Sequence, residues 1–472
     1  MASHEKIQTF VDGFWDGEIL PTIQEYIRVP NVSPQFDPEW EKHGHMEKAL
    51  QLVKNWVEER KPQGSTLHVG RLPKRTPLLL LEVPGKTDQT VLMYGHLDKQ
   101  PEMTGWRDGL GPWNPVMEGE KLYGRGGADD GYAVFASVCA LRALRERNLD
   151  HARVIVVIEF SEESGSPDLP PYVEHFEKLI GKPELVICLD SGAGNYDQFW
   201  STTSLRGLVG GTLTVQVLQE GVHSGDASGI VPSSFRLLRL LLERLEDAAT
   251  GEIRPESLRV KIPEQRLEQA REVADVLKDE VYSKFPWVEG MQPVSKDRTE
   301  LVLNRTWRPE LEITGQDGIP SLQSAGNVLR PYTTLNLSLR VPPTLSTKKA
   351  QAVVKELLEK DPPYGAKVSV AFSEPAQGWD APELAPWLGK AMDEASRTYY
   401  GKPALHMGEG GSIPFMSMLG EKFPKAQFVI TGVLGPKSNA HGPNEFLHVG
   451  YAKKLTGCVA HVLEKHLDHS RR

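Results

Sequence analysis

The chain has 472 residues, and its 54 basic and 63 acidic side chains give a formal net charge of −9 at pH 7. A composition of 39% hydrophobic and 25% charged residues is typical of a globular protein, at a length that predicts more than one domain, and it excludes a low-complexity chain. The acidic balance argues against a nucleic-acid partner, because no basic surplus is available to displace counterions from phosphates.

The cysteines and the N-terminal segment indicate in which cellular compartment the protein is expected. Cys139, Cys188 and Cys458 are far apart and have no CxxC spacing, so neither a disulfide framework nor a thiolate zinc site is indicated. The first twenty residues are polar and charged where a signal peptide would be apolar, and they are predicted to form a helix. No apolar run approaches the roughly 18 residues of a membrane span. We therefore predict a cytoplasmic protein with no membrane partner.

Short, almost purely apolar runs followed by polar residues indicate strands that are buried on both faces, as in a parallel α/β sheet. These runs lie at 90–94, 153–160, 184–189 and 427–433. Helices are predicted at 133–146 and 451–467, where apolar residues recur every three or four positions.

The residue pattern changes from about residue 207. From there apolar and polar residues alternate, as in strands that expose one face to solvent. The predicted elements run strand, helix, strand, helix, strand, which resembles a split βαβ unit with an insertion. They lie at 212–218, 233–247, 333–341, 347–360 and 367–372, and a charged helix is predicted near 264–285.

The α/β pattern resumes near Trp379, so the second domain is inserted into the first. We predict an α/β catalytic domain from residues 1–206 and 379–472, with a mixed, largely parallel sheet flanked by helices. Residues 207–378 are predicted to form an inserted ferredoxin-like α+β domain.

Polar side chains follow the predicted strands of the first domain. They are His96 and Asp98, Asp129 and Asp130, Glu162 and Glu163, Asp190, and His441. Each has an ordinary structural explanation when taken alone, such as a core histidine, a helix N-cap or a solvated glutamate pair. Because the carboxyl edge of an α/β sheet is where ligands bind, their joint occurrence indicates a functional site.

Five of these residues would satisfy two divalent cations, with one imidazole and one terminal carboxylate each and a third carboxylate shared. The charges balance, since two dications are matched by Asp129, Glu163 and Asp190 together with one hydroxide. Glu162 is left over as a free carboxylate, which such a site needs as the general base for a water that bridges the metals. The set holds no thiolate, so zinc, manganese and cobalt are all admissible, and zinc is favoured by imidazole.

In these residues the chain resembles the co-catalytic metallopeptidases of metallopeptidase family twenty, which include carnosinases, aminoacylases, desuccinylases and carboxypeptidase G. The resemblance covers nearly the whole chain. Its motifs, in chain order, are GHLDKQPE (95–102), EKLYGRGGADDG (120–131), EFSEESGS (159–166), CLDS (188–191), GVHSGD (221–226), GEGGSIP (408–414) and AHGPNE (440–445).

The resemblance implies a role for each site residue. His96 and Asp190 would hold one metal, Glu163 and His441 the other, and Asp129 would bridge them. Glu162 would be the catalytic base and Asp98 the partner of His96. The family also implies a cis peptide bond between Asp129 and Asp130.

The inserted domain would serve as a lid and a dimerisation domain. His223 resembles a lid histidine that stabilises the oxyanion in the neighbouring subunit's site, and a turn histidine is the alternative. Arg340 resembles the clamp on the substrate carboxylate, and a surface-strand arginine is the alternative. The loop of Gly408, Glu409, Gly410, Gly411 and Ser412 would also bind that carboxylate, or could be only a loop.

The sequence departs from the family pattern at two places. Gly131 stands where the family commonly has lysine. Asp190 stands where glutamate is the alternative, and aspartate at this position resembles the dipeptidase and carnosinase branch. The expected activity is metal-dependent hydrolysis of dipeptides or short peptides with a free C-terminal carboxylate, and the resemblance implies a homodimer. The alternatives are an N-acyl amino-acid hydrolase or desuccinylase on the same site, and a binding module without turnover. A serine hydrolase is disfavoured because no GxSxG elbow occurs.

Overall fold

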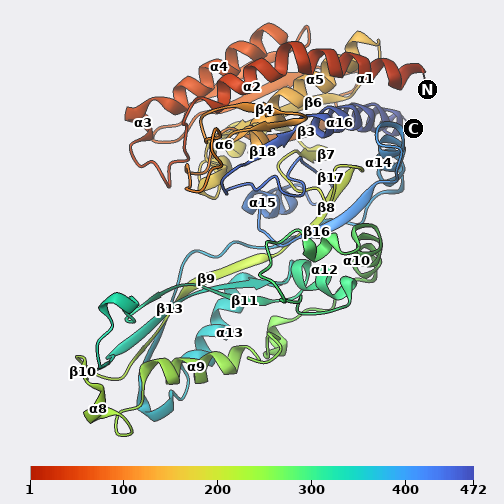
Figure 1. Cartoon of the computed structure of the whole chain (residues 1–472). Helices are drawn as coiled ribbons and strands as arrows, with labels where there is room; N and C mark the ends of the chain where they lie inside the picture. Colours follow the sequence, from red (N-terminus) through yellow and green to blue (C-terminus); the bar gives the residue numbers. More distant parts are fainter. Residues whose placement is uncertain (1, 472) are drawn as a thin grey trace. The chain divides into compact units, whose positions relative to one another are not determined.

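The computed structural model describes residues 2–471, and the chain divides into two compact units (Figure 1). Unit 1 extends to Thr203 and also contains Ala381–Met407 and the chain from Met418 onward. Unit 2 contains Ser204–Asp380 and Gly408–Ser417. The segment Gly408–Ser417, which the sequence analysis placed in the first domain, thus clusters with the second unit.

A six-stranded sheet forms the centre of unit 1, in the order β1-β2-β6-β3-β7-β17. Strands β6, β3, β7 and β17 run parallel, and β2 and β1 continue the sheet in antiparallel pairing. The strands are β1 Thr66–Gly70, β2 Leu78–Val83, β3 Thr90–His96, β6 Arg153–Glu159, β7 Pro183–Cys188 and β17 Gln427–Ile430. Every residue of β3 is buried, as its uninterrupted apolar run predicts. The mixed, largely parallel sheet of the predicted fold class is confirmed.

Helices flank this sheet (Figure 1). They are α1 Ala2–Phe14, α2 Leu20–Ile27, α3 Trp40–His43, α4 His45–Arg60, α5 Tyr132–Glu146, α6 Leu169–His175, α7 Glu177–Ile180, α14 Pro386–Tyr399 and α16 Val449–Ser470. Helix α15 Pro414–Lys422 begins in the last segment of unit 2 and continues into unit 1. Helix α5 lies close to β3, because a Cβ on Gly95 would stand only 2.5 Å from the Cβ of Ala133. Glycine at this position lets the strand and the helix approach each other.

Two smaller sheets contain strands that lie outside the central sheet. The antiparallel sheet β18-β5-β4 contains β4 Val116–Glu118, β5 Lys121–Tyr123 and β18 Phe446–His448. The sheet β15-β8-β16 contains β8 Trp200–Leu205, β15 Trp379–Asp380 and β16 Leu405–Glu409, and the chain passes from one unit to the other along these strands.

Unit 2 has a four-stranded antiparallel sheet in the order β11-β13-β9-β14. Its strands are β9 Gly207–Gln216, β11 Glu310–Asp317, β13 Tyr332–Val341 and β14 Lys367–Phe372. Burial alternates along the whole of β9, as expected for a sheet with one face on the core. Helices α9 Ser234–Leu245 and α13 Thr347–Glu359 supply the other side of that core.

The remaining elements of unit 2 are β10 Val222–His223, α8 Ser224–Ala227, α10 Glu264–Leu277, α11 Glu280–Ser283, α12 Arg298–Thr306 and β12 Val328–Leu329. The charged helix predicted near 264–285 is therefore two helices. Lys278 separates them, because its φ of 48° lies in the left-handed region and cannot continue a right-handed helix.

Within residues 2–471, no helix combines the length and apolar character that crossing a membrane requires.

Candidate metal centre

His96 and Asp98 meet at the end of β3. The Nδ1 of His96 lies 3.1 Å from the backbone oxygen of Asp98 and 3.4 Å from its Oδ1. The two carboxylate oxygens of Asp98 accept hydrogen bonds from the backbone N–H groups of Glu162 and Glu163, each at 3.0 Å. Asp98 thus orients the imidazole and anchors the turn that carries both glutamates.

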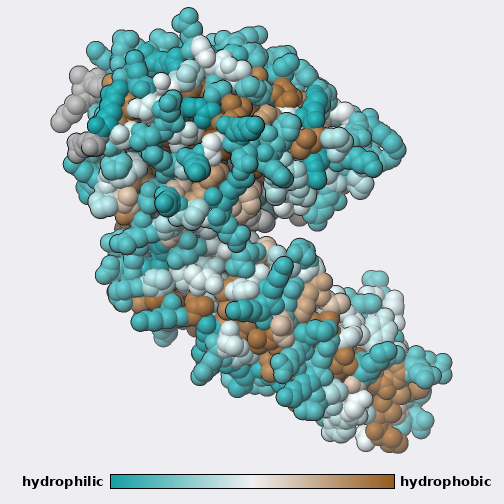
Figure 2. Space-filling view, turned by 180° about the vertical axis from the view of Figure 1, so that it is seen from behind, coloured by the Kyte–Doolittle hydropathy of each residue, from teal (hydrophilic) through white to brown (hydrophobic). Residues whose placement is uncertain are grey.

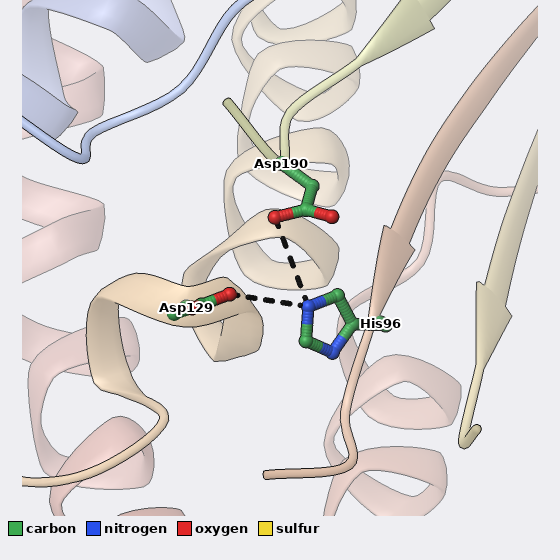
Figure 3. Close-up of side chains that lie close together, drawn as sticks. All are labelled: His96, Asp129 and Asp190. Atoms are coloured by element: carbon green, nitrogen blue, oxygen red, sulfur yellow. Dashed lines mark hydrogen bonds and ion pairs between the residues drawn. The ribbon is translucent and has the colours of Figure 1, made fainter. Parts of the chain in front are cut away.

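One group of potential ligands gathers around the other ring nitrogen of His96, Nε2 (Figure 3). The Nε2 of His96 lies 3.3 Å from Oδ1 of Asp129 and 3.7 Å from Oδ1 of Asp190. All three side chains are buried, and their ligand atoms lie within 4.8 Å of one another. The Oε2 of Glu162 is next to this group, 3.9 Å from the same nitrogen.

A second group shares Asp129. The Nε2 of His441 lies 3.1 Å from Oδ2 of Asp129 and 3.3 Å from Oε2 of Glu163. The Nε2 of Gln100 donates a hydrogen bond of 2.6 Å to the same oxygen of Glu163. Asp129 therefore presents one carboxylate oxygen to each histidine, and the five side chains named from the sequence come together in unit 1.

The turn Gly127–Gly131, which carries Asp129, leads directly into α5. Its Asp129–Asp130 peptide bond is cis, as the family resemblance implies. The backbone N–H of Gly131 donates to the carbonyl of Gly126 at 2.9 Å, and Oδ2 of Asp130 accepts from the backbone N–H of His96 at 3.2 Å. Asp130 thus ties the turn to the end of β3.

The convergence of acids in a buried space shifts their pKa values. Burial, together with the nearby charge of Asp190, raises the pKa of Glu162 well above its usual value. Burial and the charge of Asp129 raise the pKa of Glu163 likewise. Burial works in the same direction on Asp129, but hydrogen bonds from His441 and His96 hold its pKa below the usual value. Carboxylates that are buried together in their charged form are destabilised unless positive charge lies beside them.

The donors fit divalent cations. Each group supplies one imidazole nitrogen and carboxylate oxygens within 4.8 Å, and neither contains a thiolate. Zinc, manganese and cobalt accept such mixed nitrogen and oxygen ligands, whereas magnesium and calcium prefer oxygen alone.

A buried ion pair that sequence reasoning missed holds the His441 loop. Arg125 and Glu445 lie 2.5 Å apart, with side chains that are 1% and 0% exposed. The Nη2 of Arg125 also donates to the backbone oxygens of His441 and Gly442, at 3.1 and 2.8 Å. Both charged residues fall within the motifs GRGGADDG and AHGPNE, but the spacing of residues within each motif does not reveal that they pair.

The remaining predicted site residues belong to unit 2. His223 is exposed, and its Nδ1 accepts a hydrogen bond from the backbone N–H of Gly225 at 3.1 Å. Arg340 and Ser412 come together, with Nη1 of the arginine 3.2 Å from the serine Oγ. That hydroxyl donates in turn to the backbone oxygen of Arg206 at 2.6 Å.

The rest of the glycine loop is held by two further arginines. Arg206 donates to the carbonyl oxygen of Gly410 at 3.3 Å, and Arg305 lies 3.4 Å from a carboxylate oxygen of Glu409. Gly408 lies against Ser204 and Thr306, and a Cβ at Gly411 would meet open space.

Known proteins resemble this chain over most of its length. It is 28% identical over 382 residues to a cysteinylglycine-S-conjugate dipeptidase of Corynebacterium striatum, covering 77% of this chain and 79% of that one. It is 24% identical over 451 residues to the human Beta-Ala-His dipeptidase, covering 90% and 85%.

Solved structures share the fold. The di-peptidase Dug1p of Saccharomyces cerevisiae superposes with a TM-score of 0.78 at 18% identity, covering 99% of both chains. Human carnosine dipeptidase 1 superposes with a TM-score of 0.72 at 22% identity, covering 98% of this chain and 99% of that one.

The model of Peptidase family M20/M25/M40 matches residues 92–465, a range that contains both ligand groups and Glu162. This chain therefore belongs to the M20/M25/M40 family of metallopeptidases.

Proposed function

We propose that this protein is a dipeptidase that uses two divalent cations, zinc in the first instance, to hydrolyse dipeptides or short peptides with a free C-terminal carboxylate. The observation that carries the proposal is the position of Asp129, whose two oxygens lie 3.3 Å from His96 and 3.1 Å from His441. A carboxylate so shared suits a pair of metals rather than one. The relatives that are named as dipeptidases support the choice of substrate.

Bound cations would polarise the scissile carbonyl and lower the pKa of water toward neutrality. Glu162, whose side chain is 14% exposed, would accept the proton of the attacking water on its carboxylate. It would then return the proton to the leaving amine nitrogen. Asp98 would keep the Nδ1 of His96 occupied, so that Nε2 faces the cations.

The substrate carboxylate would bind in unit 2. The Arg340 guanidinium and the Ser412 hydroxyl lie together beside the loop Gly408–Ser412, and a guanidinium offers a carboxylate two parallel hydrogen bonds. Gly410 and Gly411 would offer backbone N–H groups to the same anion. Unit 2 would thus act as the lid of the proposed enzyme.

A homodimer is part of the proposal, and His223 would then serve the partner's site as an oxyanion donor. The leucine-rich stripe of the helix predicted at 233–247 suits either a dimer surface or a buried helix, and in α9 it packs into the core of unit 2. Exposed apolar side chains instead gather over the end of unit 2 that carries β10 and α8 (Figure 2). Ile230 is 81% exposed and Leu322 is 94% exposed, which is unusual for a solvent-facing surface. A cytoplasmic location remains a prediction.

The test is hydrolysis by metal-stripped protein to which zinc, manganese or cobalt is returned. A panel of dipeptides and a matched panel of N-acetyl and N-succinyl amino acids would be compared. We expect dipeptides to be cleaved faster, with activity that rises until two metal equivalents are bound and vanishes on chelation. Faster cleavage of the acylated amino acids would contradict the dipeptidase, and metal-independent turnover would contradict the site.

A further inference from the structure

Lys99 is a buried lysine beside the metal centre that the proposed reaction does not use. Its side chain is 0% exposed, and its Nζ donates to the backbone oxygens of Tyr26 and Val29, each at 2.7 Å. These carbonyls lie at the C-terminal end of α2, where helix carbonyls lack partners within the helix and attract a positive charge. The ammonium also lies 3.8 Å from the centre of the Tyr26 ring. Burial lowers the pKa of the Lys99 amine well below its usual value, against the opposing charge of Glu445.

The aliphatic stem of Lys99 covers Gly126, the residue that precedes the Asp129 turn. A Cβ on Gly126 would lie 2.6 to 2.8 Å from Cε, Cγ and Cδ of the lysine. Gly126 adopts a φ of 80°, which glycine tolerates readily, and its carbonyl accepts the hydrogen bond that closes the turn at Gly131. The lysine therefore forms a wall at the start of the turn.

Tyr26 forms the corresponding wall at the end of the turn. A Cβ on Gly131 would overlap Cε1 of Tyr26 and would also lie 2.5 Å from the backbone oxygen of Gly126, so no other residue fits there. The ring is fixed at both ends, because its hydroxyl donates to the carbonyl of Leu97 at 2.6 Å and its backbone oxygen accepts from Lys99. This packing gives a physical reason for glycine at position 131.

We propose that Lys99 and Tyr26 together clamp the turn Gly127–Gly131 and thereby hold Asp129 between the two histidines. Lys99 is a positioning residue in this arrangement. It lies three residues after His96, so one short segment sets both the imidazole and the turn that carries the shared carboxylate. The inference rests on the proposed function only in taking Asp129 as a metal ligand.

The test is Zn²⁺ binding to metal-stripped Lys99→Met, measured by titration calorimetry at a temperature where circular dichroism shows the variant folded. Methionine keeps an unbranched apolar stem and removes the ammonium. We expect zinc affinity to fall about 10- to 100-fold, the usual effect of losing a group that orients metal ligands. Wild-type affinity and stoichiometry in this variant would overturn the proposal.

Leu388→Ala is the control for general destabilisation. Leu388 is fully buried on α14, outside the clamp, so its truncation should lower stability and leave zinc affinity unchanged. Wild-type protein that binds no zinc would refute the proposed function instead, so the two failures are distinguishable.

A second pair of variants tests the proposed clamp if Lys99→Met does not fold. Gly131→Ala should weaken zinc binding, since its Cβ collides with the Tyr26 ring and with the Gly126 carbonyl oxygen that closes the turn. Tyr26→Leu, which removes the ring and its hydroxyl donor to Leu97, should weaken zinc binding as well. Unchanged binding in Gly131→Ala would show that the turn is not held by this clamp.

Discussion

At the residue scale, Glu162 is the group on which the proposed chemistry depends. Its Oε2 lies 3.9 Å from Nε2 of His96, beside the ligands but outside both ligand groups. Glutamine has nearly the same shape but cannot carry the proton, so Glu162→Gln should lower kcat by about 10²- to 10⁴-fold. Metal content by elemental analysis should equal that of the wild type. A variant that keeps the wild-type rate would remove Glu162 from the mechanism.

Asp98 is predicted to act on the metals through its neighbours. In Asp98→Asn, an amide N–H₂ would face one of the backbone N–H groups of Glu162 and Glu163 that the carboxylate now accepts. We expect metal affinity to fall about 10- to 100-fold in calorimetric titration. Asp168, which accepts the backbone N–H of Thr76 at 2.8 Å, offers the matched control. If Asp168→Asn weakens metal binding equally, the effect of Asp98 is not specific.

At the element scale, two adjacent leucines of α9 separate core packing from surface exposure. Leu241 is fully buried in the core of unit 2, whereas Leu240 is 46% exposed. Leu241→Ala should cost about 2–5 kcal/mol of unfolding free energy, because it leaves a cavity. Leu240→Ala should cost about 0.5 kcal/mol or less, as is usual on a surface. Urea unfolding followed by circular dichroism measures both, and equal losses would show that α9 packs differently.

The elements also show what a sequence pattern can specify. Apolar runs predicted β3, β6, β7 and β17, because strands buried on both faces leave no polar alternation, and the site residues followed from the strand ends. The break at Lys278 was not predictable, because a left-handed backbone is uncommon for lysine and no residue pattern signals it. For the same reason Lys99 carries no sign of burial, as a lysine in a loop motif is ordinarily solvated.

At the scale of the whole molecule, the buried pair Arg125 and Glu445 joins segments of unit 1 that are 320 residues apart. Arg125→Met would leave Glu445 buried without its partner, which typically costs about 3–5 kcal/mol. It would also remove the donors to the backbone of His441 and Gly442. We expect a lower urea midpoint and weaker metal binding together. Loss of stability with unchanged metal affinity would show that the His441 loop is held by other contacts.

The acid sensitivity of the molecule should depend in part on His466 of α16. The side chain is 2% exposed, and burial, with a smaller contribution from His469, lowers its pKa to about 4 from the ordinary 6.5. Glu184, which is 51% exposed, lies 3.7 Å from its Nε2 and does not offset the burial. As the pH falls from 6.5 to 4, the unfolded chain takes up a proton on this residue that the folded chain refuses, so stability is lost across that window.

At pH 5 this one group should cost about 2 kcal/mol of stability relative to neutral pH. His466→Leu removes the titrating ring, so its urea midpoint should fall less than that of the wild type between pH 7.5 and pH 5. The exposed neighbour His469 is the control, because His469→Leu leaves the buried ring in place and should retain most of the acid dependence. Identical pH profiles for wild type and His466→Leu would mean that the folded protein accepts the proton on His466 as easily as the unfolded chain.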